Sequence, residues 1–467
     1  MSPVALLIVC ALVPAAAFAG VWRWADSKRL SLPPDPVVAA VALPDPPMTP
    51  VLSLRRAPQA VASSISSAQL ATTLATVAAM VDDTSCLVVA VNHRTILDHG
   101  STTRVTPASN QKLLVASAAL EVLGPDYTFT TELRGTIEAG TVTGDLFFVG
   151  GGDPLLSTSN YPATQKYPPT DTTPLESLVA ALSAAGVTHI TGNVVGDDSR
   201  YDHERFVDSW ASSIKGAEAG PLGALMVNDA TSSVVPGSTA RYIDPAAGAT
   251  TDLIRLLRQA GITVDGVATV ATATQGLPVI TSITSAPLSA VIGEMLSTSD
   301  DNTAELLLKE LGVHAGAGGT RQAGLDVIMS TLAARGMDTS ALSLVDGSGL
   351  DSSNAVTCGA ILAILKHESL TNPFGVGLPI AGQTGTLAQQ FQSSDIAGRM
   401  HAKTGSLRNT KALSGYVTSA LGEIEFSLIL DFAHAGDVAN YGPVWSALAK
   451  ALSTYPAGPL ADQLQPL

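Results

Sequence analysis

A serine and a lysine stand one helical turn apart at the start of an apolar segment of this chain. The tetrad Ser109-Asn110-Gln111-Lys112 leads into Leu-Leu-Val-Ala-Ser-Ala-Ala-Leu. Residues three positions apart share one face of a helix, so the Lys112 amine can reach the Ser109 oxygen. A serine hydroxyl is a poor nucleophile until a neighbouring base takes its proton, and a lysine that burial keeps neutral can be that base. A charge that opens so apolar a helix is hard to explain as part of a solvated surface, and the pair is therefore a candidate for nucleophilic chemistry.

Two further short elements occur far down the chain, and their order is informative. One is Ser299-Asp300-Asp301-Asn302 and the other is Lys403-Thr404-Gly405-Ser406. An S-x-x-K tetrad alone is common on solvated helix surfaces. An S-x-x-K, an S-D-N-like element and a K-T-G, in that order, resemble the signature of penicillin-binding proteins and serine β-lactamases. The three elements are therefore predicted to meet in one site.

The chemistry of acyl transfer assigns roles to these residues. Transfer from an amide requires a nucleophile, a base, a proton donor for the leaving amine and hydrogen-bond donors for the oxyanion. Ser109 is the expected nucleophile and Lys112 the expected base. Ser299 is predicted to lie at the junction of two helices, where it can relay a proton to the leaving nitrogen. The backbone N–H groups of Ser109 and Ser406 are expected to form the oxyanion hole.

The K-T-G element is expected to bind the substrate. Lys403 offers a cation, and Thr404 offers a hydroxyl donor, for a substrate carboxylate. Gly405 suits an edge strand at an active site, since the close approach of a substrate backbone leaves no room for a Cβ atom. Each residue also has a simple structural explanation, such as a helix cap for Ser299 or an edge-strand charge for Lys403. With Ser406, these residues form the predicted substrate-binding strand.

Other classes of function find no support in the sequence. The formal net charge of −15 argues against a nucleic-acid partner and against a basic membrane-surface patch. There is no C-x-x-C or H-E-x-x-H motif and the eight histidines are scattered, so no metal site is predicted. Gly150-Gly151-Gly152-Asp153 lacks the third glycine of a nucleotide-binding loop, and no cofactor is expected. The absence of a G-x-S-x-G elbow disfavours a Ser-His-Asp hydrolase.

The N-terminal segment indicates export. Residues 3–22 carry no charge and are about long enough to span a bilayer. Ala17-Phe18-Ala19 resembles a signal-peptidase site, so a cleaved signal peptide and a retained membrane anchor both stay open for residues 1–30. Any membrane contact is expected through this segment alone. Residues 33–58 contain eight prolines, and residues 31–62 are therefore predicted to be an extended linker.

The remainder of the chain divides into segments that differ in residue composition and pattern. A chain of 467 residues exceeds one ordinary core, so more than one domain is expected. Residues 133–284 consist of short Thr- and Val-rich runs broken by glycine, with one helix-like stretch at about 174–186, and are predicted to be a β-rich insertion. Residues 63–132 and 285–467 are predicted to form the catalytic domain. After the K-T-G element, two strands and a terminal helix fit an antiparallel sheet covered by helices.

Two cysteines lie beyond the N-terminal segment. Cys86 opens a β-rich run that ends at Val91, and Cys358 lies in a predicted helix at about 355–367. In an exported protein the two could form a disulfide, or each could be a small buried residue. The sequence leaves both alternatives open.

From about residue 65 to its C-terminus, the chain resembles the class C low-molecular-mass penicillin-binding proteins. These are the D-alanyl-D-alanine carboxypeptidases and endopeptidases of bacterial cell walls. Besides the three elements above, the resemblance includes the stretches Gly144-Asp145-Leu146 through Gly152-Asp153-Pro154, Pro221–Leu225 with Asn228, Asp346–Leu350, Leu378–Gly382, Gly385-Thr386-Leu387 and Lys403–Leu407 with Leu413–Val417.

The resemblance implies both a fold and an activity. The implied α+β fold is a penicillin-recognising, transpeptidase-like domain. Its antiparallel sheet is covered by helices and lies beside an all-helical subdomain, and a large insertion follows the S-x-x-K helix. The implied activity is that of an exported serine-type carboxypeptidase, which acts through an acyl-enzyme on peptidoglycan stem peptides ending in D-Ala-D-Ala. Some members also cleave the cross-link between stems. β-Lactam antibiotics are the implied inhibitors, and a β-lactamase or esterase on the same scaffold is the alternative enzyme.

The chain departs from the family pattern at one position. That pattern is S-D-N, two residues, then A-E, and counting back from Ala304-Glu305 puts Asp301 at the asparagine position. Either an aspartate replaces the amide, or the turn is one residue longer and Asn302 points into the site. We expect the inward Asn302, because a carboxylate there would repel the substrate carboxylate. An inward Asp301 would favour a catalytically weak peptidoglycan-binding protein.

Overall fold

The computed structural model describes residues 3–28 and 58–458, which fall into two separate units, Met1–Arg56 and Ala57–Leu467. The described part of the first unit contains the helix α1 (Pro3–Ser27). Within the described ranges, no helix is long and apolar enough to cross a membrane.

The predicted proline-rich linker, residues 31–62, falls mostly outside the described residues. Its last part, residues 58–62, is helical and belongs to α2 (Pro58–Ala78), which begins at a proline. Proline is well tolerated in the first turn of a helix, where its missing N–H group would have no intrahelical partner. The linker prediction was therefore wrong for residues 58–62.

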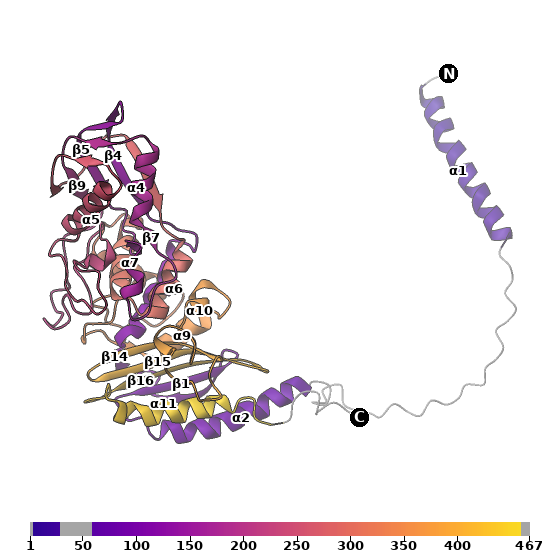
Figure 1. Ribbon diagram of the computed structural model, residues 1–467. Helices are drawn as coiled ribbons and strands as arrows, with labels where there is room; N and C mark the ends of the chain where they lie inside the picture. Colours follow the sequence, from indigo (N-terminus) through magenta and orange to yellow (C-terminus); the bar gives the residue numbers. More distant parts are fainter. Residues whose placement is uncertain (1–2, 29–57, 459–467) are drawn as a thin grey trace. The chain divides into compact units, whose positions relative to one another are not determined.

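The second unit is built on a five-stranded antiparallel sheet with the order β14-β15-β16-β1-β2 (Figure 1). In Figure 1, α2 and α11 lie side by side along one face of this sheet. Every residue of β1 is buried, because helices also cover the opposite face. The strands and the covering helix are β1 (Cys86–Val91), β2 (Arg94–His99), β14 (Met400–Leu407), β15 (Thr410–Ser419), β16 (Gly422–Asp431) and α11 (Val438–Ser453).

A helical layer packs on the opposite face of the sheet. At its centre is α3, whose buried residues run from Gln111 to Ala119, as expected for the apolar S-x-x-K helix. One helix of this layer, α8, was not predicted from the sequence. The layer comprises α3 (Gln111–Val122), α6 (Leu288–Thr298), α7 (Asp301–His314), α8 (Arg321–Ala334), α9 (Cys358–His367) and α10 (Pro373–Val376).

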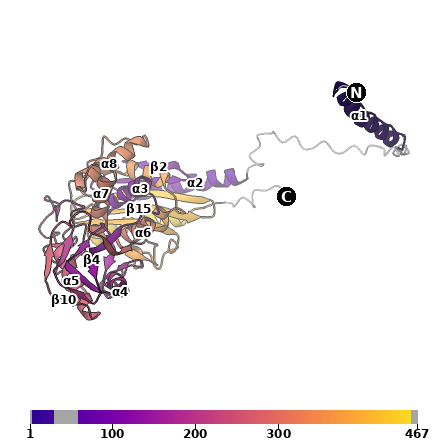
Figure 2. The ribbon, with the colours of Figure 1, turned by 90° about the horizontal axis from the view of Figure 1, so that it is seen from above.

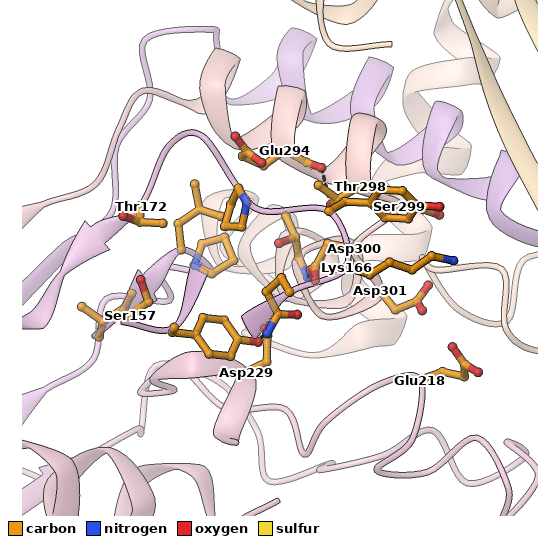
Figure 3. A pocket seen from close by; sticks show the side chains of 18 residues that line it. Ser157, Lys166, Thr172, Glu218, Asp229, Glu294, Thr298, Ser299, Asp300 and Asp301 are labelled. Atoms are coloured by element: carbon orange, nitrogen blue, oxygen red, sulfur yellow. Dashed lines mark hydrogen bonds between the residues drawn. The ribbon is translucent and has the colours of Figure 1, made fainter. Parts of the chain in front are cut away.

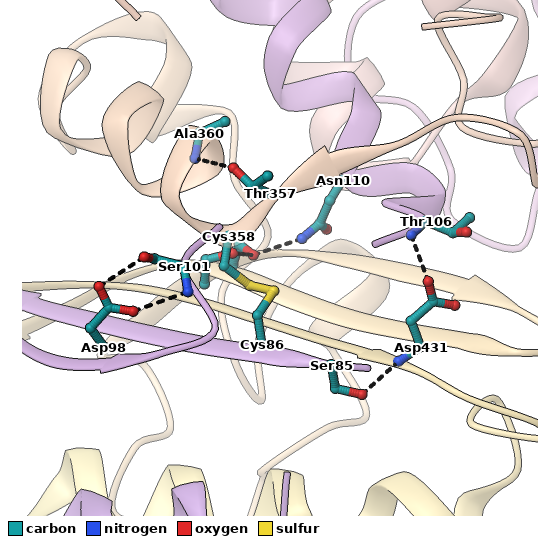
Figure 4. Close-up of a disulfide and its surroundings, with 12 residues drawn as sticks. Ser85, Cys86, Asp98, Ser101, Thr106, Asn110, Thr357, Cys358, Ala360 and Asp431 are labelled. Carbon is teal, nitrogen blue, oxygen red and sulfur yellow. Dashed lines mark hydrogen bonds between the residues drawn. A yellow bond between two sulfur atoms is a disulfide. The ribbon is translucent and has the colours of Figure 1, made fainter. Parts of the chain in front are cut away.

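A disulfide between Cys86 and Cys358 joins the sheet to this helical layer (Figure 4). Cys86 is the first residue of β1 and Cys358 the first of α9, and the two Cα atoms lie 6.0 Å apart. Next to it, β3 (Arg104–Val105) pairs with β13 (Val356–Thr357). Of the two alternatives left open by the sequence, the structure has the disulfide.

A second sheet of seven strands occupies residues 130–284, between the S-x-x-K helix and α6. Figure 2 shows β4 and β10 of this sheet at the end of the body away from α2. The strand-forming runs were predicted, but α5 was not, although Asp244-Pro245 is an N-cap followed by proline. The elements are β4 (Thr130–Glu138), β5 (Thr141–Val149), β8 (His189–Ile190), β9 (Val194–Asp197), β10 (Thr263–Val264), β11 (Ala268–Val270), β12 (Val279–Thr284), α4 (Leu175–Ala184) and α5 (Pro245–Gln259), beside a short pair β6 (Leu156–Ser157) and β7 (Thr173–Pro174).

Candidate active site

Ser109 and Lys112 meet at the start of α3, in the contact that the helical spacing predicts. Ser109 is half-buried in a short 3₁₀ turn, Ala108–Asn110, which runs directly into the helix. The Lys112 side chain is fully buried, and its Nζ atom donates to Ser109 Oγ at 3.1 Å. The same amine donates to the Ser348 carbonyl oxygen at 2.7 Å and to Asp301 Oδ1 at 2.6 Å. An ammonium group has three donors, so each of them has a partner, and one partner is the serine oxygen.

A buried acidic group holds the loop that supplies the Ser348 carbonyl. Glu305 Oε1 accepts from the backbone N–H groups of Ser348 at 2.7 Å and Gly347 at 3.0 Å. Burial raises the pKa of Glu305 to about 8, and the nearby charge of Asp346 adds to this effect. Neither Glu305 nor Ser348 was predicted from the sequence to have a role. The available signal was the position of Glu305, one helical turn after the S-D-N-like element and so on the same helix face.

Ser299 and Lys403 form the second polar pair. Ser299 follows the last residue of α6 in a left-handed conformation with φ of +67°, at the predicted junction of two helices. Lys403 is fully buried in β14, and its Nζ atom donates to Ser299 Oγ at 2.7 Å and to the Thr404 carbonyl oxygen at 2.9 Å. Burial holds the pKa of Lys403 well below its usual value, and the charge of Lys112 lowers it further, against the opposing charge of Asp301. The two lysines are therefore electrostatically coupled.

The K-T-G strand β14 is the edge strand of its sheet, as predicted. A Cβ atom on Gly405 would lie 2.9 Å from the Pro107 carbonyl oxygen, so the glycine lets the strand approach the turn that carries the S-x-x-K serine. The backbone that leaves no room for a Cβ atom at Gly405 is thus the protein's own, whereas a substrate backbone was expected there. Thr404 Oγ1 donates to Thr386 Oγ1 at 3.0 Å. Ser406 is exposed at the end of the strand.

The expectation that Asn302 points into the site was wrong. Asp300 is the N-cap of α7, and its carboxylate accepts from the N–H group of Thr303, so Asp301 is the first helical residue. Asp301 faces the lysine of the S-x-x-K element. Successive residues on a helix point about 100° apart, and Asn302 turns away. Its Oδ1 accepts from the Gly220 N–H at 3.0 Å and its Nδ2 donates to Asp229 Oδ1 at 3.0 Å.

A cavity of about 240 Å³ opens beside the S-D-N-like element (Figure 3). Figure 3 shows Ser299, Asp300 and Asp301 on one side of it and Ser157 and Thr172 on the other. Burial raises the pKa of Asp300 to about 7, and the charge of Asp229 adds to this shift. The charged residues that line the cavity are Lys166, Glu218, Asp229, Glu294, Asp300 and Asp301.

No metal centre accompanies these acidic groups in the described part of the chain. Within residues 3–28 and 58–458, no cluster of three or more His, Cys, Asp or Glu side chains is arranged to hold a metal ion. The reactive side chains that the structure places at the site are hydroxyls, amines and carboxylates. The two hydroxyl–amine pairs, Ser109–Lys112 and Ser299–Lys403, come from three separate segments of the chain. The three sequence elements were predicted to meet in one site, but the pairing of Ser299 with Lys403 was not predicted.

Comparison with known proteins gives related sequences of similar extent. The chain is 29% identical over 433 residues to a D-alanyl-D-alanine carboxypeptidase of Actinomadura sp. (strain R39), covering 75% of this chain and 77% of that protein. It is 28% identical over 367 residues to the carboxypeptidase DacB of Mycolicibacterium smegmatis, covering 76% of each. Both relatives are similar along most of the body that carries the site.

A solved structure has the same fold. Penicillin binding protein 4 (dacB) from Haemophilus influenzae matches with a TM-score of 0.67 at 21% sequence identity, covering 82% of this chain and 99% of that one. This match confirms the predicted α+β, penicillin-recognising fold class. The family model of the D-Ala-D-Ala carboxypeptidase 3 (S13) family matches residues 66–242 and 233–441. The chain therefore belongs to this family of serine-type D-Ala-D-Ala carboxypeptidases, which confirms the resemblance inferred from its motifs.

Proposed function

We propose that the protein releases the terminal D-alanine of peptidoglycan stem peptides through an acyl-enzyme on Ser109. The observation that carries this proposal is the 3.1 Å hydrogen bond from the buried Lys112 amine to the half-buried Ser109 hydroxyl. A nucleophile and a base within hydrogen-bond reach, with further groups that orient the base, are the pattern of nucleophilic catalysis. The Ser348 carbonyl and Asp301 are those further groups here.

Acylation begins with transfer of a proton from Ser109 to Lys112. The reactive form of the site has a neutral Lys112, since only a neutral amine can accept that proton. Ser109 Oγ then attacks the carbonyl carbon of the penultimate D-alanine and forms a tetrahedral intermediate. The backbone N–H groups of Ser109 and Ser406 donate to its oxyanion, and this is the term that usually contributes most to such reactions.

The second pair returns a proton to the leaving group. Once Lys112 has gained a proton, its charge disfavours the ammonium form of Lys403, in keeping with the direction of the pKa shift at Lys403. Lys403 gives a proton to Ser299 Oγ, 2.7 Å away, while Ser299 passes its own proton to the nitrogen of the departing D-alanine. The C–N bond breaks, and a water molecule later hydrolyses the serine ester. The protons then redistribute between the two lysines, and the site is restored.

The hydroxyls of Thr404 and Ser406 hold the terminal carboxylate of the substrate. They alternate with buried residues along β14, so they lie on one face of the edge strand. The Lys403 amine is fully buried and directed to Ser299, so it acts on the carboxylate only through its field. Asn302 has no part in binding, because its amide is occupied by Gly220 and Asp229.

The protein is proposed to act in the cell envelope. Its relatives are named as D-alanyl-D-alanine carboxypeptidases, and peptidoglycan, which carries D-Ala-D-Ala stems, lies outside the cytoplasm. Residues 1–30 would direct export. β-Lactam antibiotics are the expected inhibitors; a β-lactam complex of the related Haemophilus influenzae protein is a solved structure. Cleavage of the cross-link between stems is a further activity that the same acyl-enzyme chemistry allows.

The ion pair between Asp301 and Lys112 favours a second candidate function. A carboxylate 2.6 Å from the base stabilises its charged form, in which it cannot accept a proton. A protein with this pair permanently closed would bind peptidoglycan and react only slowly. The rate of acylation decides between the two candidates.

The experiment combines penicillin labelling with a peptidase assay on the full chain. Intact-mass spectrometry after incubation with a penicillin should show one covalent adduct, which should persist for many minutes, and Ser109→Ala should show none. A stem peptide ending in D-Ala-D-Ala should release free D-alanine. Rapid loss of the adduct would identify a β-lactamase. Binding to peptidoglycan sacculi without an adduct would identify the non-catalytic candidate.

A further inference from the structure

Lys411 lies directly across the sheet from the last residue of the K-T-G-S element. β14 and β15 are joined by a tight turn, and Ser406 and Lys411 are register partners in the antiparallel pair. Side chains of directly opposed residues lie on the same face of a sheet. The Lys411 Nζ atom donates to Ser406 Oγ at 2.6 Å. The Lys411 amine is thus hydrogen-bonded to β14, which also carries the Lys403 amine of the K-T-G triplet.

This lysine has no carboxylate partner in the part of the chain that the structure describes. Its amine lies instead over two rings of α11, 4.3 Å from the centroid of Tyr441 and 5.0 Å from that of Trp445. Aromatic rings attract a cation through their quadrupole and leave its hydrogen-bond donors free. Burial lowers the pKa of Lys411, and no described anion offsets that shift. A positive charge is therefore held at the strand end without a counter-charge.

The position of the Lys403 amine bears on the role of the Lys411 charge. The Lys403 amine is fully buried and donates to Ser299 and to the carbonyl of its neighbour Thr404. These hydrogen bonds direct the amine to Ser299 and so to the proposed proton relay. A terminal carboxylate along β14 therefore feels the field of Lys403, and any hydrogen-bonded arrangement that includes a cation must use a different side chain.

The hydrogen bond from Lys411 also fixes the direction of the Ser406 hydroxyl. A serine hydroxyl has one donor and two acceptor lone pairs. Because Lys411 occupies an acceptor position, the Ser406 hydrogen is directed to another group. Ser406 is exposed, so that group can be a ligand. Hydrogen bonds in such a chain polarise one another, which makes the hydroxyl a stronger donor.

We propose that Lys411 is a positioning and specificity-determining residue for the terminal carboxylate of the substrate. It orients the Ser406 hydroxyl as a donor to that carboxylate and supplies the positive charge that favours an anionic substrate over a neutral one. This inference rests on the proposed function of the site. The selected substrate class is a peptide with a free C-terminal carboxylate, or a β-lactam that carries the equivalent carboxylate.

The test compares acylation by a penicillin with acylation by the carboxamide of the same penicillin. Lys411→Met keeps most of the side chain against Tyr441 and Trp445 but removes the charge and the donor. We expect the second-order acylation rate for the penicillin to fall by roughly tenfold, and the rate for the carboxamide to change less than twofold. Lys411→Arg should recover most of the penicillin rate. Lys450→Met, which removes an exposed lysine from the last turn of α11, should alter neither rate.

A second variant shows whether the effect passes through the hydroxyl. Ser406→Ala keeps the backbone N–H of the proposed oxyanion hole, so it should reproduce the selective loss. The double variant should lose little more than either single variant, since coupled residues are not additive. Equal losses on both probes, or no loss with Lys411→Met, would overturn the inference. A wild-type protein that neither probe acylates would instead refute the proposed function on which the inference rests.

Discussion

The carboxylate of Asp301 lies 2.6 Å from the amine of Lys112, which also donates to the hydroxyl of Ser109. A base in this position must be neutral to act, whereas an adjacent carboxylate stabilises its charged form. The expectation of an inward Asn302 assumed that a carboxylate at this position would have no counter-charge. The buried lysine supplies that counter-charge to Asp301. In the proposed mechanism, this ion pair must therefore open before the serine can lose its proton.

Lys112→Arg should reduce acylation by a penicillin by roughly 10²- to 10⁴-fold, although the charge is kept. Arginine stays protonated in proteins and cannot accept the Ser109 proton. The measurement is the rate of adduct formation by intact-mass spectrometry, with circular dichroism as the control for folding. A folded variant with a rate near that of the wild type would show that Lys112 is only a structural charge.

Lys403→Met should slow acylation by a penicillin and by its carboxamide to a similar extent. The sequence predicted that Lys403 would bind the substrate carboxylate, but its buried amine donates to Ser299 at 2.7 Å. Its loss removes the proton source for the relay, which is worth roughly 10²-fold or more in such reactions. Stopped-flow acylation with both probes provides the comparison. A loss confined to the carboxylate-bearing probe would restore the original assignment.

The main features of the fold could be predicted because they are local patterns in the sequence. The S-x-x-K spacing placed Lys112 against Ser109, and Gly405 indicated that the K-T-G element lies on an edge strand. The two strands and the helix after it indicated an antiparallel sheet. The direction of side chains at a helix start could not be predicted in the same way. It depends on which residue caps α7, and Asp300 rather than Asp301 does so. One residue of difference turns a helix by about 100°.

Contacts between distant segments were the other part that sequence patterns could not supply. The Lys411 amine contacts Tyr441 and Trp445 only because α11 folds back across the sheet. Glu305 reaches Ser348 only because α7 packs against the Asp346–Leu350 turn. Helical spacing could place Glu305 on the helix face of Asp301, but no periodic pattern predicts either contact, since each depends on how separate elements pack.

Glu305→Gln should change the pH dependence of stability. The pKa of Glu305 is raised to about 8 in the folded protein, from an ordinary value of 4.5, chiefly by burial. Between these two values the folded state binds more protons at this group than the unfolded state does, so stability must fall as pH rises. The contribution is fully present below about pH 4.5 and is lost as pH passes through about 8.

Thermal unfolding from pH 5 to pH 9 measures this effect. The wild-type Tm should fall by several degrees more across the range than the Tm of Glu305→Gln, which has no group to titrate at this position. Buried acids that do not interact with Glu305 affect both proteins alike, so the difference reports Glu305 together with its interaction with Asp346. Glu138→Gln, at an exposed glutamate, is the matched control and should follow the wild type. Parallel Tm profiles for Glu305→Gln and the wild type would contradict the prediction.

Asn302→Ala should affect stability far more than acylation. The amide of Asn302 is buried and satisfies the N–H group of Gly220 and the carboxylate of Asp229. Leaving a buried partner without a hydrogen bond costs about 1–3 kcal/mol. A lower Tm with an acylation rate within about threefold of the wild type is the expected result. A large loss of acylation in a variant of normal stability would return Asn302 to the site.

Asp301→Asn is the complementary change, and it should raise the acylation rate while lowering the Tm. The side chain of Asp301 is 13% exposed and that of Lys112 is fully buried, so the neutral amide removes the main stabiliser of the ammonium form. The amine then loses its proton more readily, and a substrate carboxylate no longer meets a fixed negative charge. We expect acylation at neutral pH to rise by roughly tenfold or more, since a tenfold change needs only about 1.4 kcal/mol and two charges at this separation in a partly buried site interact by at least that much. Breaking a buried pair by removing one partner is strongly destabilising when the other keeps its charge, so the Tm should fall. Slower acylation by Asp301→Asn would show that the carboxylate itself takes part in the reaction, as a proton acceptor for Lys112.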